Sequence, residues 1–267
     1  EPKENFHKKI RFINKTIFVK THKIEKYFNI LYYLIMGKPL QVGYFFSSEM
    51  KSKINEIKKD YNIIIFHLIR SGEFLPINYE GEKILEMTDL ISKNYLQLQK
   101  KLSFINPLKY IYLIEKILLE KYEKKIIVPF NRIVLVSKED VKYFSISNKL
   151  KRKIKIVSNG TDSKKKLYKF KKQNKDIIFI GNINYLPNKI ACYDFIKTIM
   201  PELEMKQINI NFKIIGHTSK LLKFYLTRFK NVEVYNNVKS PEKLCRNAIC
   251  GISNLSVVTG IQNKIME

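Results

Sequence analysis

The chain has 267 residues, 45% of them hydrophobic, which is enough for one large or two medium domains and excludes a disordered protein. Its formal net charge of +26 indicates an anionic partner: nucleic acid, an acidic membrane surface or a phosphorylated substrate. Only six of the 50 basic residues are arginines, the preferred residues for contacts with bases and phosphates, so nucleic acid is the least favoured of these partners. Three cysteines and four histidines form neither a disulfide framework nor a zinc pattern, which favours a reducing cytoplasm.

Two kinds of segment alternate along the chain. Continuous runs rich in Ile and Val predict parallel strands buried on both faces. These runs cover residues 62–69, 132–137, 153–158, 176–181, 211–216, 231–236 and 248–253. Amphipathic stretches predict helices at 47–60, at 188–203 with Asn188 as N-cap, and after Ser240 with Pro241 in the first turn. Alternating strands and helices predict an α/β fold.

The stretch from Tyr79 to Val128 breaks this alternation, because it shows helical spacing and no convincing strand. Within it, residues 106–127 predict a long helix that is apolar on one side and rich in lysine on the other. The favoured interpretation is a helix packed on the sheet with its lysines in solvent. The alternative is that the basic side rests on an anionic membrane surface.

A charged segment with few aliphatic residues, Ser163–Lys175, lies between two strand signals. It predicts a linker between two α/β halves. We therefore expect one domain at residues 1–165 and a second at 166–267.

Ligands of open α/β sheets bind beyond the carboxyl ends of the strands, so the residues that follow each strand are the candidates. In the second half these are Gly181 with Asn182, Gly216, and the turn at Gly260. Glycines let the backbone approach a phosphate, and a helix N-terminus offers free N–H groups, which together predict a nucleotide-diphosphate site. An ordinary turn glycine is the alternative at each position. The chain contains neither a P-loop nor the dinucleotide-binding fingerprint.

In the first half, His67 and Arg70 lie at or just past a predicted strand end. They are candidate catalytic residues: a histidine that faces substrate and a cation for phosphate. The alternative is a partly buried histidine and a surface arginine. The spacing of Ser, Cys, His and acidic residues suggests no catalytic triad and no metal-binding carboxylate pair.

Several of these stretches together resemble the bacterial family-4 glycosyltransferases of the GT-B fold, and among them the sugar transferases of exopolysaccharide and capsule synthesis. The most specific stretches are "IIFIGNINYLPNKIACYDFIKTIMPEL" and the terminal "GIQNKIME". The stretch "SNGTD" (Ser158–Asp162) matches the segment that precedes the interdomain linker in this family. The resemblance covers most of the chain from Gly37 onward.

The resemblance implies two Rossmann-like domains facing a cleft, both incomplete in this chain, which would be an interior fragment without activity of its own. The family pattern Glu-x7-Glu places the glutamate that binds the donor ribose at Glu267, and puts Thr259 where the first glutamate stands. Lys189 and Lys264 are candidates for the diphosphate. No metal and no cofactor are implied beyond the nucleotide-sugar donor.

The expected activity is therefore a retaining, metal-independent hexosyl transfer from a nucleotide sugar to a lipid-linked or polysaccharide acceptor. It would take place in the cytoplasm, with peripheral contact at the inner face of the cytoplasmic membrane. Because Thr259 departs from the family pattern, a nucleotide-binding module without catalysis is the first alternative. A basic nucleic-acid binder is the second, although no nucleic-acid partner is expected.

Overall fold

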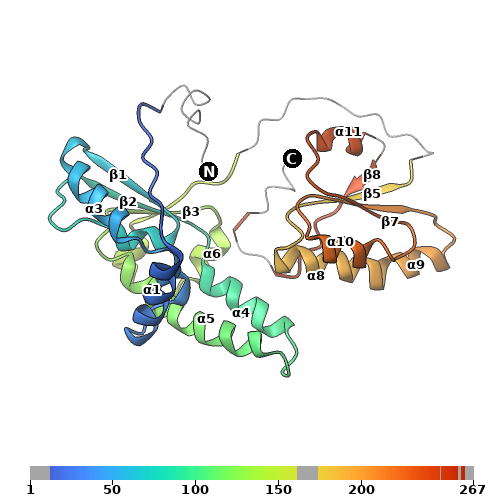
Figure 1. Cartoon of the computed structure of the whole chain (residues 1–267), viewed down its shortest axis with the longest axis horizontal. Helices are drawn as coiled ribbons and strands as arrows, with labels where there is room; N and C mark the ends of the chain where they lie inside the picture. The colour runs from blue at the N-terminus through green and yellow to red at the C-terminus, as the bar shows by residue number, and fades with distance from the viewer. Residues whose placement is uncertain (1–12, 161–173, 247, 258–259, 262–267) are drawn as a thin grey trace. The chain divides into compact units, whose positions relative to one another are not determined.

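Figure 1 shows the computed structural model of the chain, which describes residues 13–160, 174–246, 248–257 and 260–261. The chain divides into two compact units, Glu1–Val157 and Ser158–Glu267. The domain boundary predicted between residues 165 and 166 lies outside the described residues.

The first unit is built on a parallel sheet with the strand order β1-β2-β3-β4. Its strands are β1 (Ile63–His67), β2 (Glu82–Thr88), β3 (Arg132–Leu135) and β4 (Ile154–Ile156). Three of them, β1, β3 and β4, confirm the strands predicted from the runs of Ile and Val.

Strand β2 corrects the prediction that residues 79–128 contain no strand. Its side chains alternate: Leu85 and Met87 are fully buried, whereas Glu82 and Glu86 point to the opposite face. The prediction missed β2 because it looked for continuous apolar runs, whereas a strand with one polar face alternates with a period of two.

The helices of the first unit were predicted only in part. They are α1 (Lys23–Ile35), α2 (Leu40–Phe45), α3 (Ser48–Ile57), α4 (Ile91–Lys101), α5 (Pro107–Ile126), α6 (Lys138–Tyr143) and α7 (Asn148–Lys151), with the 3₁₀ turns η2 (Lys58–Asp60) and η3 (Ile69–Phe74). The long helix predicted at 106–127 is α5, and the helix predicted at 47–60 is α3 followed by η2. The side chain of Ser47 caps α3 by accepting a hydrogen bond from the Met50 N–H at 3.3 Å.

Helices α1, α4 and α5 all lie on one side of the β1–β4 sheet (Figure 1). The core between sheet and helices includes Leu85, Met87, Ile133 and Leu135. On the other face of β1, Ile63 and Ile65 are 50% and 64% exposed. Within the described residues, this face of β1 is therefore open, contrary to the expectation of strands buried on both faces.

The second unit contains a parallel sheet with the order β7-β6-β5-β8. Its strands are β5 (Asp176–Ile180), β6 (Asn211–Ile215), β7 (Val232–Tyr235) and β8 (Ala248–Gly251), all of which were predicted. Its helices are α8 (Leu186–Asp194), the π-helical turn η4 (Phe195–Ile199), α9 (Met200–Met205), α10 (Lys220–Leu226) and α11 (Pro241–Cys245). Together the two units confirm the predicted α/β fold with Rossmann-like parallel sheets.

Asn188 does not cap its helix, contrary to prediction. Helix α8 begins two residues earlier, with Tyr185 as N-cap and Pro187 in the first turn. The side-chain amide of Asn188 donates instead to the carbonyl oxygen of Asn182, at 2.8 Å. The later helix α11 does begin at Pro241 after Ser240, although the Ser240 side chain makes no capping hydrogen bond.

Two buried carboxylates on one face of α5 bind the N-termini of other helices. Glu115 accepts hydrogen bonds from the backbone N–H groups of Leu40 (2.8 Å) and Gln41 (3.1 Å), at the start of α2. Glu123 accepts from the N–H (2.9 Å) and hydroxyl (2.5 Å) of Ser92, at the start of α4. These bonds satisfy donors that a helix leaves unpaired in its first turn.

Burial nevertheless disfavours the charged form of both groups. It raises the pKa of Glu115, and it raises the pKa of Glu123 to about 7, against the opposing effect of the hydrogen bonds from Ser92. Glu123 therefore stays neutral in the folded state at pH values where the unfolded chain has ionised it.

We predict that the contribution of Glu123 to the free energy of unfolding is fully present below the ordinary pKa of 4.5 and is lost as the pH rises through 7. A Glu123→Gln variant keeps a neutral acceptor and should lack this loss. Urea unfolding at pH 4.5, 6 and 8 should show the wild-type chain losing about 3 kcal/mol relative to the variant. Parallel pH profiles of the two proteins would contradict the prediction.

Candidate functional site

Two loops at the carboxyl edge of the second sheet are interlocked through their backbones. Gly181 follows β5 and Gly216 follows β6. The Gly181 N–H donates to the Ile215 carbonyl at 3.0 Å, and the Ile183 N–H donates to the His217 carbonyl at 2.8 Å. Gly216 has φ +144°, and a Cβ added there would lie 1.9 Å from the Gly181 carbonyl oxygen. Only glycine fits this position, so Gly216 is more than an ordinary turn residue.

Asparagine side chains hold the same two loops. Asn182 accepts at Oδ1 from the Asn184 N–H (3.1 Å), and Asn184 accepts from the Ser219 N–H (2.9 Å). Asn236, after β7, accepts from the Thr218 N–H and donates to the Thr218 carbonyl. Of these asparagines only Asn182 was predicted, although Asn recurs after successive strands and this recurrence was a visible signal.

Helix α8 begins directly after the Gly181–Tyr185 loop, which places its first-turn N–H groups at this edge of the sheet. Lys189 lies in the first turn of α8 and is half-buried, and no ion pair to it occurs among the described residues. The structure thus brings together Gly181, Asn182, Gly216 and Lys189. Gly260 is described and has φ +64°, the left-handed conformation that favours glycine.

Three further predicted donor contacts, Thr259, Lys264 and Glu267, lie outside the described residues.

In the first unit, the predicted catalytic His67 is the last residue of β1. Its Nδ1 contacts the Glu86 carboxylate on β2, and Glu86 also accepts a hydrogen bond from the Thr88 hydroxyl at 2.7 Å. The His67 side chain is 71% exposed, so it is not the partly buried histidine of the alternative interpretation. Glu86 was not among the predicted residues, because strand β2 was not predicted.

Arg70 follows in η3, where its guanidinium lies 4.0 Å from the centre of the Phe45 ring. It is half-buried, not a surface arginine, and burial lowers its pKa. No carboxylate pairs with Arg70 in the part of the chain that the structure describes.

The backbone at this edge is strained at two neighbouring strand ends. Leu68, after β1, has φ +67°, and Thr88, the last residue of β2, has φ +65°. Positive φ is unfavourable for both residues, and most of all for the β-branched Thr88. Two hydrogen bonds hold the strained backbone: the Leu68 N–H donates to the Glu86 carbonyl at 2.7 Å, and the Val136 N–H to the Thr88 carbonyl at 3.0 Å. Strain of this kind concentrates at functional sites, which supports His67 as a candidate.

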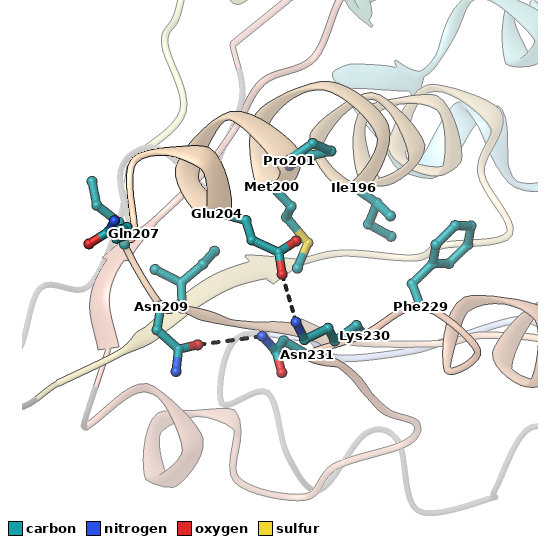
Figure 2. Close-up of a pocket in the computed structure, with 11 residues that line it drawn as sticks. Ile196, Met200, Pro201, Glu204, Gln207, Asn209, Phe229, Lys230 and Asn231 are labelled. Atoms are coloured by element: carbon teal, nitrogen blue, oxygen red, sulfur yellow. Dashed lines mark hydrogen bonds and ion pairs between the residues drawn. The ribbon is translucent and has the colours of Figure 1, made fainter.

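A hollow of about 400 Å³ lies at the opposite, amino edge of the second sheet, between α9 and the turns that precede β6 and β7 (Figure 2). Across it, Glu204 pairs with Lys230 at 2.6 Å and Asn231 donates to Asn209 at 3.4 Å. None of the residues predicted for the site lines it. The hollow is therefore separate from the candidate donor site.

Comparison with known proteins supports the fold. No protein-family model and no curated protein sequence matches the chain. A solved structure of TarM superposes with a TM-score of 0.56 at 15% identity, over 81% of this chain and 41% of TarM. Lower scores are obtained with the apo form of the lipopolysaccharide outer core galactosyltransferase WaaB (0.47, 11% identity, 76% and 53% covered) and with α,α-trehalose 6-phosphate synthase from Burkholderia multivorans (0.48, 8% identity, 79% and 54% covered).

The chain thus spans well under two thirds of the length of each of these neighbours.

We predict that Gly216→Ala disrupts the interlocked loops, because the new Cβ meets the Gly181 carbonyl oxygen and the backbone is in a glycine conformation. The free energy of unfolding of the second unit should fall by at least about 2 kcal/mol. Gly251→Ala is the matched control, since the nearest atom to its Cβ lies 3.9 Å away; it should change stability by less than about 1 kcal/mol. Equal denaturation midpoints for the two variants would refute the interlock.

The parallel α/β sheets of the two units and the superposition on TarM identify the architecture of the chain as that of the GT-B fold.

Proposed function

We propose that the protein is a glycosyltransferase that moves a hexose from a nucleotide-sugar donor to a lipid-linked or polysaccharide acceptor, with retention of configuration and without a metal ion. The observation that carries the proposal is the interlocked pair Gly181 and Gly216 beside the N-terminus of α8. The family-4 resemblance over the same residues supports it, as does the shared GT-B fold.

In this proposal the donor diphosphate lies beside the two glycine loops, whose close approach at Gly181 and Gly216 holds the N-terminus of α8 at the edge of the sheet. The N-terminus of α8 and the ammonium group of Lys189 supply positive charge. That charge stabilises the negative charge that develops on the leaving diphosphate. Gly260, Thr259 and Lys264 complete the donor site, and Glu267 binds the ribose.

On the acceptor side, we assign His67 and Arg70 to the reacting groups. Glu86 fixes the imidazole of His67 through Nδ1, which leaves Nε2 to face substrate. Arg70 is fixed by stacking on Phe45 and carries a charge without a carboxylate partner among the described residues, as a phosphate-binding cation requires.

The chain spans 41% of the length of TarM, so the activity is proposed for the full reading frame. On the family-4 resemblance, we propose that the reaction belongs to the synthesis of bacterial envelope polysaccharide and occurs in the cytoplasm, at the inner membrane face. A non-catalytic nucleotide-binding module is the second candidate, favoured by Thr259 in place of the family glutamate.

We predict that one nucleoside diphosphate among UDP, GDP, ADP and CDP raises the melting temperature of the chain in the presence of a chelator. Lys189→Gln should weaken that nucleotide about tenfold, because a charge-assisted contact to phosphate is lost. Lys206→Gln, which removes the same charge at the end of α9, should leave the affinity unchanged. The donor-site assignment would be refuted if no diphosphate shifted the melting temperature, or if the two variants changed the affinity equally.

We also predict that His67→Gln in the full reading frame lowers the turnover of the donor by about 10²-fold or more. Its affinity for the nucleoside diphosphate should stay at the wild-type value, because that site lies in the other unit. Unchanged turnover would exclude His67 from the reaction. Absence of turnover in the wild-type protein, with nucleotide binding intact, would favour the non-catalytic module.

A further inference from the structure

Helix α1 carries its apolar side toward solvent. Five large apolar residues recur at helical spacing along it, and we call them the α1 stripe: Ile24, Tyr27, Phe28, Leu31 and Ile35. Each is between 57% and 75% exposed. A surface helix normally buries such a stripe, and contiguous exposed apolar surface of this kind marks an interaction site.

The opposite side of α1 holds the helix on the protein, largely by polar contacts. The Glu25 carboxylate accepts from the N–H (3.1 Å) and hydroxyl (3.0 Å) of Ser48, and the Asn29 amide donates to the Phe46 carbonyl (3.3 Å). A Cβ added at Gly43 of α2 would lie 2.6 Å from the Asn29 carbonyl oxygen, so the two helices are in close backbone contact. These contacts fix the rotation of α1 about its axis and leave the stripe outside.

The surroundings of the stripe are basic. Lys15, Lys20 and Lys23 are exposed at and before the start of α1, and the apolar side chain of Phe18 is half exposed between them. From residue 13 to residue 36 the only acidic residue is Glu25, whose carboxylate is engaged by Ser48. An apolar stripe flanked by lysines is complementary to a partner that has an anionic outer layer over an apolar interior.

We propose that the α1 stripe docks on an anionic lipid bilayer, with the helix lying in the plane of the interface. With 13 residues α1 is about 20 Å long, too short to cross the hydrocarbon core. No helix in the described ranges is long and apolar enough to span a membrane.

A second copy of the chain fits the stripe poorly, because each copy has a formal charge of +26 and the lysines of two copies would face each other.

This inference assigns the expected membrane contact to α1, whereas the sequence offered the lysine side of α5 only as an alternative interpretation. It adds an anchor to the proposed transferase but does not depend on transfer, because binding to vesicles is measured without donor or acceptor. The lysines of α5 serve as the competing surface in the test.

The first experiment is sedimentation of the chain with vesicles of phosphatidylcholine alone or with one third phosphatidylglycerol. The wild-type chain should bind the anionic vesicles. The double variant Phe28→Asp with Leu31→Asp should reduce binding more than tenfold, because it puts charges on the stripe. Its melting temperature should be unchanged, because both side chains are exposed in the wild type. Leu221→Asp, on an 80% exposed residue of α10, is the matched control and should bind like the wild type.

Charge variants separate the two helices. Lys20→Gln and Lys23→Gln should each weaken binding about fivefold, and raised salt should weaken it in the wild type. Lys121→Gln with Lys124→Gln on α5 should have little effect. A larger loss from the α5 pair than from Lys20→Gln or Lys23→Gln would overturn the proposal.

The chain contains no tryptophan, so Leu31→Trp creates a single reporter on the stripe. Its emission should shift to the blue with anionic vesicles, and quenchers should place it about 5–10 Å below the headgroups. Leu221→Trp should not shift. The proposal fails if wild type does not bind, if the stripe variants bind equally, or if the stripe is instead covered in a dimer that Phe28→Asp dissociates.

Discussion

The arrangement of the first unit depends on the two carboxylates that α5 buries, Glu115 and Glu123. Each lies in a place where an isolated charge would be costly, and each is offset by the N-terminus of another helix. Glu115 holds α2, and α2 is in backbone contact with α1, so the outward rotation of the α1 stripe is linked to a carboxylate on α5. Glu123 holds the start of α4, which directly follows the end of β2.

Both units place their candidate groups at the carboxyl ends of parallel strands, but they shape the site differently. The second unit uses glycines, which have no side chain. Gly181 and Gly216 therefore let two backbone segments approach each other, and asparagines connect the loops by hydrogen bonds. The first unit positions side chains on a strained backbone, with Leu68 and Thr88 at positive φ and the imidazole of His67 against Glu86. A helix N-terminus held beside closed loops suits a diphosphate, because it offers free N–H groups, and a positioned imidazole suits a reacting hydroxyl.

Within the described residues, seven of the eight strands could be predicted from the sequence, because short runs rich in Ile and Val between turn residues are typical of strands. Strand β2 could not be found by that criterion, since Glu82 and Glu86 give it a polar face. That one omission concealed the partner of His67. Asn188 shows a second limit: its residue type favours a cap, but the chain starts the helix at Leu186 and uses the side chain to hold Asn182. Which backbone group a polar side chain binds is set by tertiary packing, which local patterns do not contain.

The basic composition gains a physical meaning only when individual lysines are placed. Some lysines form ion pairs within the fold: Lys93 pairs with the buried Asp140 at 2.8 Å, and Lys213 pairs with Asp176 at 2.5 Å. Lys189, in the first turn of α8, can act over the short range of a hydrogen bond to one phosphate. In the proposed membrane contact, Lys20 and Lys23 would act over the Debye length of about 8–10 Å, which depends on salt. A net charge cannot distinguish these roles, because it adds them together. In the two proposals, the exposed stripe beside Lys23 and the glycine loops before Lys189 distinguish these roles, since each would supply the uncharged part of the binding surface for a different anionic partner.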